Sequence, residues 1–396
     1  MIFVPTDDIL PNPVKNLRHN PVLDEIPQNL MVTLEERKRE LRRARKPLFD
    51  FGLGDPLEPT PPFLRQALRE AVPAVSQYPS ASGTPELRRA CAGYLSRRFG
   101  VEVDPERQIL PATGAKETIF HLPLAFARGD PRRNLVVMPD PGYPSYEAGT
   151  LFAGLEPLKV PLEAGRHFLV EPEALGEEVL SRTLLFWVNY PHNPTGALAP
   201  RAYLERLGRA ALRHGFIVAS DECYADIYFG EPPLSLLEVQ VENALAIHSC
   251  SKRSGMTGYR SGFLAGDPDL LAVLRRARSY PGVASPDFVT AAAVAAWSDD
   301  AHPAERREVF RRKRERFLAF FAEHGLACHG SQATLYLWVK VPPGHTSGSY
   351  ALALLEEGIV VAPGTSFGAG EGYVRVALVP TLEESERAIL AWRRVR

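Results

Sequence analysis

The amino-acid sequence predicts an α/β fold in which a large, mostly parallel sheet is flanked by helices and joined to a smaller α+β region. Between about residue 50 and residue 266, short apolar runs alternate with helical patterns. Those runs are almost free of polar side chains, as in strands that are buried on both faces of a sheet. Past about residue 285 a long charged helical pattern replaces the alternation. This order of elements is typical of a parallel sheet followed by a second, smaller domain.

The composition excludes several classes of protein. The chain has 396 residues, enough for one large domain and a smaller one. Its formal net charge of −1 provides no overall field that would favour nucleic acid or an anionic membrane. The four cysteines form no Cys-x-x-Cys pair, so we expect neither a metal site nor a disulfide framework, and a reducing cytoplasm fits. No apolar run is long enough to span a bilayer.

The N-terminal segment is irregular. Proline and asparagine interrupt residues 1–32, and we expect this segment either to wrap a partner surface or to be partly disordered. Thr33 and Glu36 form a capping-box pattern, which predicts that a helix begins there. The expected division is an N-terminal segment that joins the small domain (1–48), a large domain (49–285) and a small C-terminal domain (286–396).

Five apolar runs predict strands of the large sheet. They are LVVM (135–138), TLLFWV (183–188), FIVAS (216–220), ALAIH (244–248) and GFLAG (262–266). Helical patterns lie between them, and the clearest follows Pro200, a residue suited to the first turn of a helix. Leu204, Leu207 and Ala211 share one face of that helix. Gly215 suits its C-terminal cap.

The C-terminal region begins with a long helical pattern, ERREVFRRKRERFLAFFAEHG. Phe310, Phe317 and Phe320 recur in it at helical spacing, which indicates a packed helix rather than a localisation signal. The strands and helices expected after it are a strand at TLYLWVKV, a helix near SYALALLEEG, strands at VVAP and YVRVAL, and a last helix.

Four short motifs lie at the ends of predicted strands, which is where open α/β sheets bind ligands. The first, ATGAKETIF, precedes an apolar helix whose first backbone N–H groups can bind an anion. The second, NYPHNPTG, is a proline-rich turn that would hold Asn193 rigidly at the edge of the sheet. Each of these two motifs, taken alone, is also compatible with an ordinary turn.

The other two motifs contain charged residues in apolar surroundings. SDECYADIY places Asp221 at the end of an apolar strand and Tyr224 shortly after it. A buried carboxylate needs a cation or a hydrogen-bond donor, although Asp221 could also cap the next helix. HSCSKRSGMTGYR places Lys252 among small hydroxyl, thiol and glycine residues and ends in Arg260. A lysine in that setting needs a partner or a covalent role.

These residue types fit one chemical task at one edge of the sheet. A buried lysine can form a Schiff base. A buried carboxylate can keep the nitrogen of a pyridine ring protonated, so that the ring accepts electrons. Tyrosine and asparagine can hydrogen-bond to an oxygen on the ring. Serines, an arginine and a helix N-terminus can hold a phosphate.

With these motifs the sequence resembles the fold-type I enzymes that depend on pyridoxal 5'-phosphate, and among them the class I and II aminotransferases. The resemblance extends from LGDP (53–56) to VRVAL (374–378) and rests on NPTG, D-E-x-Y and S-K-x-x-x-M-x-G-x-R in that order. It implies a seven-stranded, mostly parallel sheet in the large, cofactor-binding domain and a small domain built from the N- and C-terminal segments. It also implies a homodimer with shared active sites that acts on amino-acid and keto-acid substrates.

Carried over to this sequence, the resemblance assigns cofactor attachment and proton transfer to Lys252. It implies that Asp221 pairs with the pyridinium nitrogen and that Asn193 and Tyr224 contact the ring oxygen. Phosphate contacts are implied for Gly114, Ala115, Lys116, Ser249, Ser251 and Arg260.

Four further positions match the family pattern. Tyr143 would stack on the cofactor, and Tyr78 would reach the phosphate in the other subunit. Gly54 lies in a loop near the substrate, and Arg375 would clamp the substrate α-carboxylate. Without the resemblance, Tyr143 would be a turn aromatic, Tyr78 a core residue and Arg375 half of a salt bridge.

The substrate can be inferred only from the similarity of short segments to those of known enzymes. FGLGDPLEPTP, the GAKETIF turn and PDPGYPSYEAGTLFAG look most like the diaminopimelate and N-succinyl-diaminopimelate aminotransferases of lysine biosynthesis, which would use glutamate and 2-oxoglutarate as the second pair. Aspartate, alanine and aromatic aminotransferases remain alternatives, as does a β-lyase on the same fold. Spacing identifies no second arginine for a dicarboxylate substrate.

Overall fold

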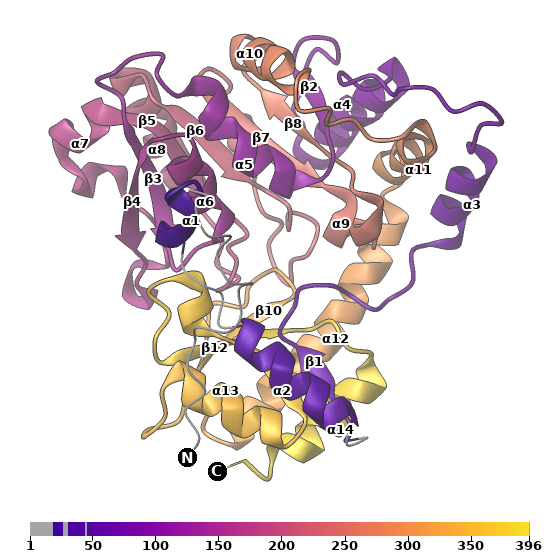
Figure 1. The fold of residues 1–396 in the computed structure, drawn as a ribbon, viewed down its shortest axis with the longest axis vertical. Coiled ribbons are helices and arrows are strands. Elements are labelled where there is room, and N and C mark those ends of the chain that lie inside the picture. The colour runs from indigo at the N-terminus through magenta and orange to yellow at the C-terminus, as the bar shows by residue number, and fades with distance from the viewer. Residues whose placement is uncertain (1–18, 27–30, 44–45, 396) are drawn as a thin grey trace.

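The computed structural model describes residues 19–26, 31–43 and 46–395, and the predictions for the remaining residues lie outside it. Its strands form two sheets, each accompanied by helices (Figure 1). In Figure 1 the larger sheet lies in the upper part of the view and the smaller sheet in the lower part, and α12 (Ala301–Glu323) runs between the two.

The larger sheet has seven strands in the order β2-β8-β7-β6-β5-β3-β4. β8 is antiparallel to both of its neighbours, and the other four strand pairs are parallel. The predicted mostly parallel, seven-stranded sheet is therefore confirmed, including all five strands expected from apolar runs. The strands are β2 (Ile109–Ala112), β3 (Leu135–Asp140), β4 (Glu156–Pro161), β5 (Thr183–Val188), β6 (Ile217–Asp221), β7 (Ala244–Ser249) and β8 (Gly262–Gly266).

Side chains on the central strands alternate between two cores. Phe186 and Val218 pack into the core on one face, while Leu185 and Ala219 pack into the core on the other. Both faces are covered by helices, which explains why the strands could be recognised as continuous apolar runs. The first core contains side chains from α3 (Pro62–Glu70), α4 (Pro85–Phe99), α7 (Gly176–Arg182), α8 (Arg201–His214) and α11 (Asp287–Trp297), and the second from α5 (Ala115–Phe126), α6 (Ser145–Phe152) and α10 (Pro268–Arg278).

Two helix boundaries test the sequence-based signals. α8 begins directly after Pro200, which is its N-cap rather than a residue of its first turn. Its C-cap is Gly215, whose φ of 69° is the left-handed conformation that glycine adopts without strain, so the predicted C-terminal cap is confirmed. The prediction that a helix begins at Thr33 is wrong, because α2 (Met31–Arg43) already includes that residue.

The smaller sheet has the order β1-β11-β12-β10-β9. β1, from the N-terminal part of the chain, pairs in parallel with β11, so both ends of the chain contribute to this sheet. Phe310, Phe317 and Phe320 are buried in its core, as their spacing predicted. Its elements are β1 (Phe49–Phe51), β9 (Cys328–His329), β10 (Tyr336–Lys340), β11 (Ile359–Pro363), β12 (Tyr373–Ala377), α13 (Ser347–Glu356) and α14 (Leu382–Trp392).

α11 packs with the larger sheet although it follows residue 285. The ring centroid of Trp297 lies 4.7 Å from that of Tyr94 on α4 and 4.9 Å from that of Phe263 on β8. The larger core therefore extends through Trp297.

None of the helices in the described ranges is long and apolar enough to cross a membrane. Within the same ranges, no group of three or more His, Cys, Asp or Glu side chains is arranged to hold a metal ion. The four cysteines are not joined by disulfides.

Candidate active site

The four motifs leave the large sheet at one edge. The neighbouring parallel strands β5, β6 and β7 have their carboxyl ends there. β2 ends at the same edge, because β8 is antiparallel to both β2 and β7. The motifs line a cavity of about 440 Å³, and residues of the smaller sheet such as Tyr336, Ala362 and Arg375 form its opposite wall.

Every predicted site residue except Gly114 and Tyr78 lines this cavity. Gly114 lies at its wall, since a Cβ atom added there would be only 2.6 Å from Nη2 of Arg260. Tyr78 is fully exposed, so it is not the core residue that one interpretation predicted. The predicted residues that line the cavity are Gly54, Ala115, Lys116, Tyr143, Asn193, Asp221, Tyr224, Ser249, Ser251, Lys252, Arg260 and Arg375.

Lys252 lies on a single helical turn, α9 (Cys250–Arg253), directly after β7. Ser249 caps this turn: its hydroxyl oxygen accepts a hydrogen bond from the backbone N–H of Ser251 (3.1 Å). The Lys252 ammonium donates to the backbone carbonyl of Gly54, which follows β1 of the smaller sheet. No carboxylate in the described part of the chain forms an ion pair with it, so the amine is held by a neutral acceptor that a reacting group can replace.

Asp221 is the last residue of β6 and is almost completely buried. Its carboxylate accepts hydrogen bonds from the hydroxyl of Tyr146 (2.8 Å) and from the backbone N–H of Cys223 (3.2 Å). No helix begins here for Asp221 to cap. Burial raises the pKa of the Asp221 carboxyl, because removal from water disfavours the charged form. A cationic group placed against this carboxylate would restore its ionised form.

Asn193 is held in place by a second asparagine. The Asn189 side chain accepts a hydrogen bond from the backbone N–H of Asn193 (2.8 Å) and donates to the carbonyl of Asp221 (2.7 Å), so it ties the two motifs together. Oδ1 of Asn193 accepts a hydrogen bond from Nη1 of Arg375 (3.0 Å). The Asn193 amide is therefore in direct contact with the arginine of the opposite wall.

Arg375 is buried on β12 without a carboxylate partner in the described ranges. Its guanidinium carbon lies 4.1 Å from the ring centroid of Tyr336 and 4.4 Å from that of Phe367, so two aromatic rings pack against the cation. Nη2 donates to the carbonyl of Gly52 (2.8 Å), whereas the buried Nε has no hydrogen-bond partner within the part of the chain that the structure describes. A buried guanidinium with a free N–H suits an incoming carboxylate, and it does not fit the salt-bridge interpretation.

The anion-binding end of the cavity is formed by the start of α5 and by Arg260. Gly114 precedes this twelve-residue helix with a φ of 81°, which favours glycine, and Ala115 and Lys116 of the first turn of α5 line the cavity. Arg260 packs against Gly114 and donates from Nη1 to the carbonyl of Thr257 (2.8 Å). Ser249 and Ser251 line the same cavity.

Known proteins resemble this chain over nearly its whole length. The family model for aminotransferases of class I and II matches residues 46–392. The chain belongs to this family. The LL-diaminopimelate aminotransferase of Aquifex aeolicus is 37% identical over 378 residues, which cover 92% of this chain and 97% of that protein. The enzyme with the same description from Desulforudis audaxviator is 38% identical over 365 residues, covering 90% of this chain and 92% of that protein.

Solved structures of aminotransferases share the fold. The probable N-succinyldiaminopimelate aminotransferase of Thermus thermophilus superposes with a TM-score of 0.85 at 32% identity and covers 92% of this chain and 100% of that chain. The aspartate aminotransferase of the same organism with maleate gives a TM-score of 0.87 at 28% identity, over 96% of this chain and 100% of that one.

As an aminotransferase, this enzyme has amino-acid and keto-acid substrates, and its family uses pyridoxal 5'-phosphate. The cavity fits that cofactor on three observations. The amine of Lys252 pairs with no carboxylate among the described residues, the buried Asp221 carboxyl favours a cationic neighbour, and the backbone at Gly114 leaves no room for a side chain beside Arg260.

The aminotransferase site also contains residues that sequence reasoning missed. Tyr146 hydrogen-bonds to Asp221 and stacks on Trp187, with ring centroids 4.8 Å apart. Tyr336 places its hydroxyl 3.1 Å from that of Tyr224, and Phe367 covers Arg375. Tyr146 lies three residues after Tyr143, in the turn that leads into α6, and this closeness in sequence could have signalled it.

Proposed function

We propose that this aminotransferase holds pyridoxal 5'-phosphate between Lys252 and Asp221 and moves an amino group between a diaminopimelate-type amino acid and 2-oxoglutarate, as a step of lysine biosynthesis in the cytoplasm. The observation that carries the proposal is that Lys252, Asp221 and Arg375 meet in one cavity. The choice of substrate is supported by relatives described as LL-diaminopimelate aminotransferases, which are 34% to 38% identical to this chain.

When bound, the cofactor supplies a ring that accepts the electron pair left on the substrate Cα. The amine of Lys252 would hold the cofactor covalently and, once released, move the proton at Cα. Asp221 would accept a hydrogen bond from the ring nitrogen and keep it protonated, because a buried carboxylate favours a cationic neighbour. Asn193 and Tyr224 would contact the ring oxygen.

Arg375 would bind the substrate α-carboxylate through its free Nε and one neighbouring N–H, and Gly54 would face the substrate. Tyr143 would stack on the cofactor ring. The phosphate would be held by Gly114, Ala115, Lys116, Ser249, Ser251 and Arg260.

We also propose a homodimer in which Tyr78 reaches the phosphate bound by the other subunit. Its complete exposure supports this role, because an exposed aromatic side chain is available to a second chain. The division into domains is part of the same proposal. The boundaries expected at 48/49 and 285/286 shift so that β1 belongs to the small domain and α11 to the large domain. β1 (Phe49–Phe51) pairs with β11, and α11 (Asp287–Trp297) packs with the larger core, so both elements change sides.

Replacing Lys252 with alanine tests the chemistry. We expect the variant to lose transamination while it still binds the cofactor, because the other contacts remain. Lys159→Ala is the matched control, since Lys159 pairs with Glu147 and does not line the cavity. Transamination by Lys252→Ala at the rate of the unmodified enzyme would refute the assignment.

A half-reaction screen tests the substrate. Single amino acids are added to the purified holoenzyme, and loss of the visible absorbance of the bound cofactor is recorded. LL-diaminopimelate, its N-succinyl form, glutamate, aspartate, alanine and the aromatic amino acids form the panel. We expect loss with glutamate and with one diaminopimelate form. Loss with aspartate, alanine or an aromatic amino acid but no diaminopimelate form would contradict the substrate, and turnover without any keto acid would indicate a β-lyase.

A further inference from the structure

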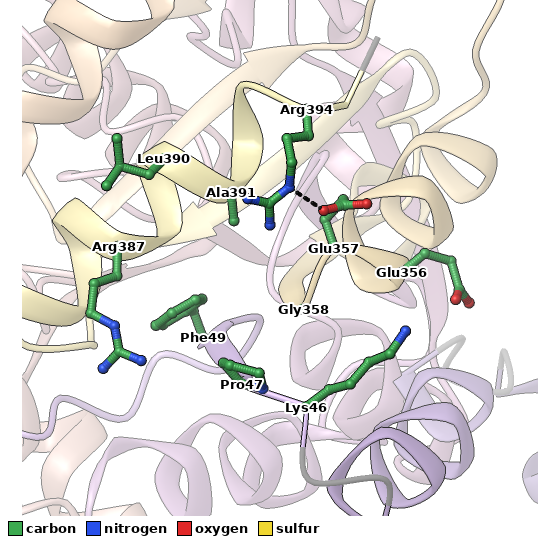
Figure 2. A pocket seen from close by; sticks show the side chains of 10 residues that line it. All are labelled: Lys46, Pro47, Phe49, Glu356, Glu357, Gly358, Arg387, Leu390, Ala391 and Arg394. Carbon is green, nitrogen blue, oxygen red and sulfur yellow. Dashed lines mark hydrogen bonds and ion pairs between the residues drawn. The ribbon is translucent and has the colours of Figure 1, made fainter.

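A second cavity, of about 460 Å³, lies beside the smaller sheet (Figure 2). It is formed by the segment that enters β1, by the turn between α13 and β11, and by α14. The chain segments approach closely there, since a Cβ atom added at Gly358 would be 2.2 Å from the carbonyl oxygen of Pro47. The volume is in the range of small-molecule sites.

The carboxylates of this second cavity are already paired. Glu357 accepts a hydrogen bond from Nε of Arg394 (2.6 Å), the contact drawn in Figure 2. Glu356 accepts two hydrogen bonds from Arg37 on α2, from Nε (2.9 Å) and from Nη2 (2.8 Å). Both negative charges are therefore balanced by arginines.

Two cations of the cavity remain uncommitted. Lys46 and Arg387 line it, and neither side chain forms an ion pair or hydrogen bond with any residue in the described ranges. The guanidinium carbon of Arg387 lies 5.3 Å from the ring centroid of Phe49, which positions the cation beside an aromatic ring. Figure 2 shows Phe49 and Pro47 between the Arg387 and Lys46 side chains, so apolar surface separates two free positive charges.

We propose that this second cavity is a binding site for a small organic dianion. One anionic group would pair with Arg387 and the other with Lys46, while the apolar body of the ligand lies against Pro47 and the edge of Phe49. Arginine and lysine both bind carboxylate and phosphate groups, so dicarboxylates and phosphate esters share the required chemistry.

The same strands connect this cavity to the active site. β1 begins at Phe49, whose N–H donates to Gly358 (2.8 Å), and it leads after three residues to Gly52, whose carbonyl holds Arg375 (2.8 Å). At about 3.3 Å per residue, the strand spans roughly 10 Å. β11 runs parallel to it and places Ala362 opposite Arg375. A ligand that fixes the start of β1 would therefore alter how Arg375 is held, and its occupancy would change the KM for the amino donor.

Isothermal titration calorimetry with isophthalate, a planar dicarboxylate, tests the binding. We expect the affinity of the holoenzyme to fall at least tenfold in Arg387→Met and in Lys46→Met. Arg393→Met is the matched control, because Arg393 pairs with Glu323 and does not line the cavity, and it should bind as the unmodified enzyme does. Inorganic phosphate is titrated in parallel. Arg387-dependent binding of isophthalate supports a dicarboxylate site, and Arg387-dependent binding of phosphate alone supports a phosphate-ester site.

The proposal is overturned if neither anion binds, or if affinity is unchanged in Arg387→Met and lost instead in Arg375→Met, which would locate the anion in the active site. Coupling is tested with saturating isophthalate, which should shift the KM for the amino donor in the unmodified enzyme and not in Arg387→Met. An unshifted KM, or a shift that persists in Arg387→Met, would refute the coupling. Calorimetry does not depend on the substrate, so failure here leaves the proposed function untouched.

Discussion

Replacing Arg253 with methionine tests how the lysine-bearing turn is held. Arg253 directly follows Lys252 and is almost fully buried. Its Nε lies 2.8 Å from Oδ2 of Asp226, Nη1 donates to the carbonyl of Ala296 (2.5 Å) and Nη2 donates to that of Asp299 (2.8 Å). One side chain thus connects α9 to the turn after β6 and to the end of α11.

The expected loss can be worked from these contacts. Removing one partner of a buried ion pair costs about 3–5 kcal/mol, because the other charge stays buried. Asp226 would keep Nε of Arg98 (3.2 Å) and the hydroxyl of Tyr94 (3.1 Å), which favours the lower end of that range. The two carbonyls that lose their donors add about 1 kcal/mol together. We therefore expect Arg253→Met to lower the free energy of unfolding by about 4 kcal/mol.

Urea unfolding followed by circular dichroism measures this loss. The control is Arg89→Met, because Arg89 pairs with Glu86 at 2.8 Å in a solvent-exposed position and should contribute about 1 kcal/mol or less. In the folded variant we also expect kcat to fall while the KM changes little, since the backbone that carries Lys252 is no longer held by the Arg253 contacts. A loss no larger than that of Arg89→Met would refute the reasoning.

Two other substitutions test the anion end and the pH dependence. Gly114→Ala should weaken cofactor retention about tenfold in dialysis, because its Cβ would displace Arg260. Gly154→Ala is the control, since Gly154 has a similar φ of 70° and an added Cβ would meet no described atom within 4 Å. It should lose about 1 kcal/mol of stability and retain the cofactor. Burial raises the pKa of the Glu222 carboxyl to about 7. The folded state therefore binds the carboxyl proton more tightly than the unfolded state does. The protein loses stability as the pH rises from about 5 to above 7. Glu222→Gln should therefore gain stability relative to the unmodified protein between about pH 5 and pH 8 in urea unfolding, and parallel pH profiles would contradict this.

Much of the lining of the candidate site could be predicted from the sequence because its residues lie in contiguous segments. Each motif directly follows a strand that is recognisable as an apolar run, and parallel strands bring their carboxyl ends to one edge. Asn193 and Lys252 follow β5 and β7, and Asp221 ends β6 between them, so their convergence follows from strand order alone.

Contacts between the two sheets could not be predicted in this way. Tyr336 and Phe367 reach Arg375 only because the smaller sheet packs across the cavity, and no local pattern encodes that packing. The start of α2 was missed for a different reason. The same kind of pattern as at Thr33 and Glu36 can also occur inside a helix when the preceding residues are helical too. It therefore did not mark the residue at which α2 begins.

The two cations of the active site each bridge the two sheets. Lys252, after β7, donates to Gly54, after β1, and Arg375 on β12 donates to Asn193, after β5. In the proposed function, a substrate would take N–H groups of Arg375 and free the amine of Lys252, so binding would exchange bonds across this boundary for bonds to the substrate. The substrate side chain would then lie where segments from both sheets meet. On this proposal the motifs at the strand ends specify the cofactor chemistry, whereas substrate choice depends on how the two sheets are packed together.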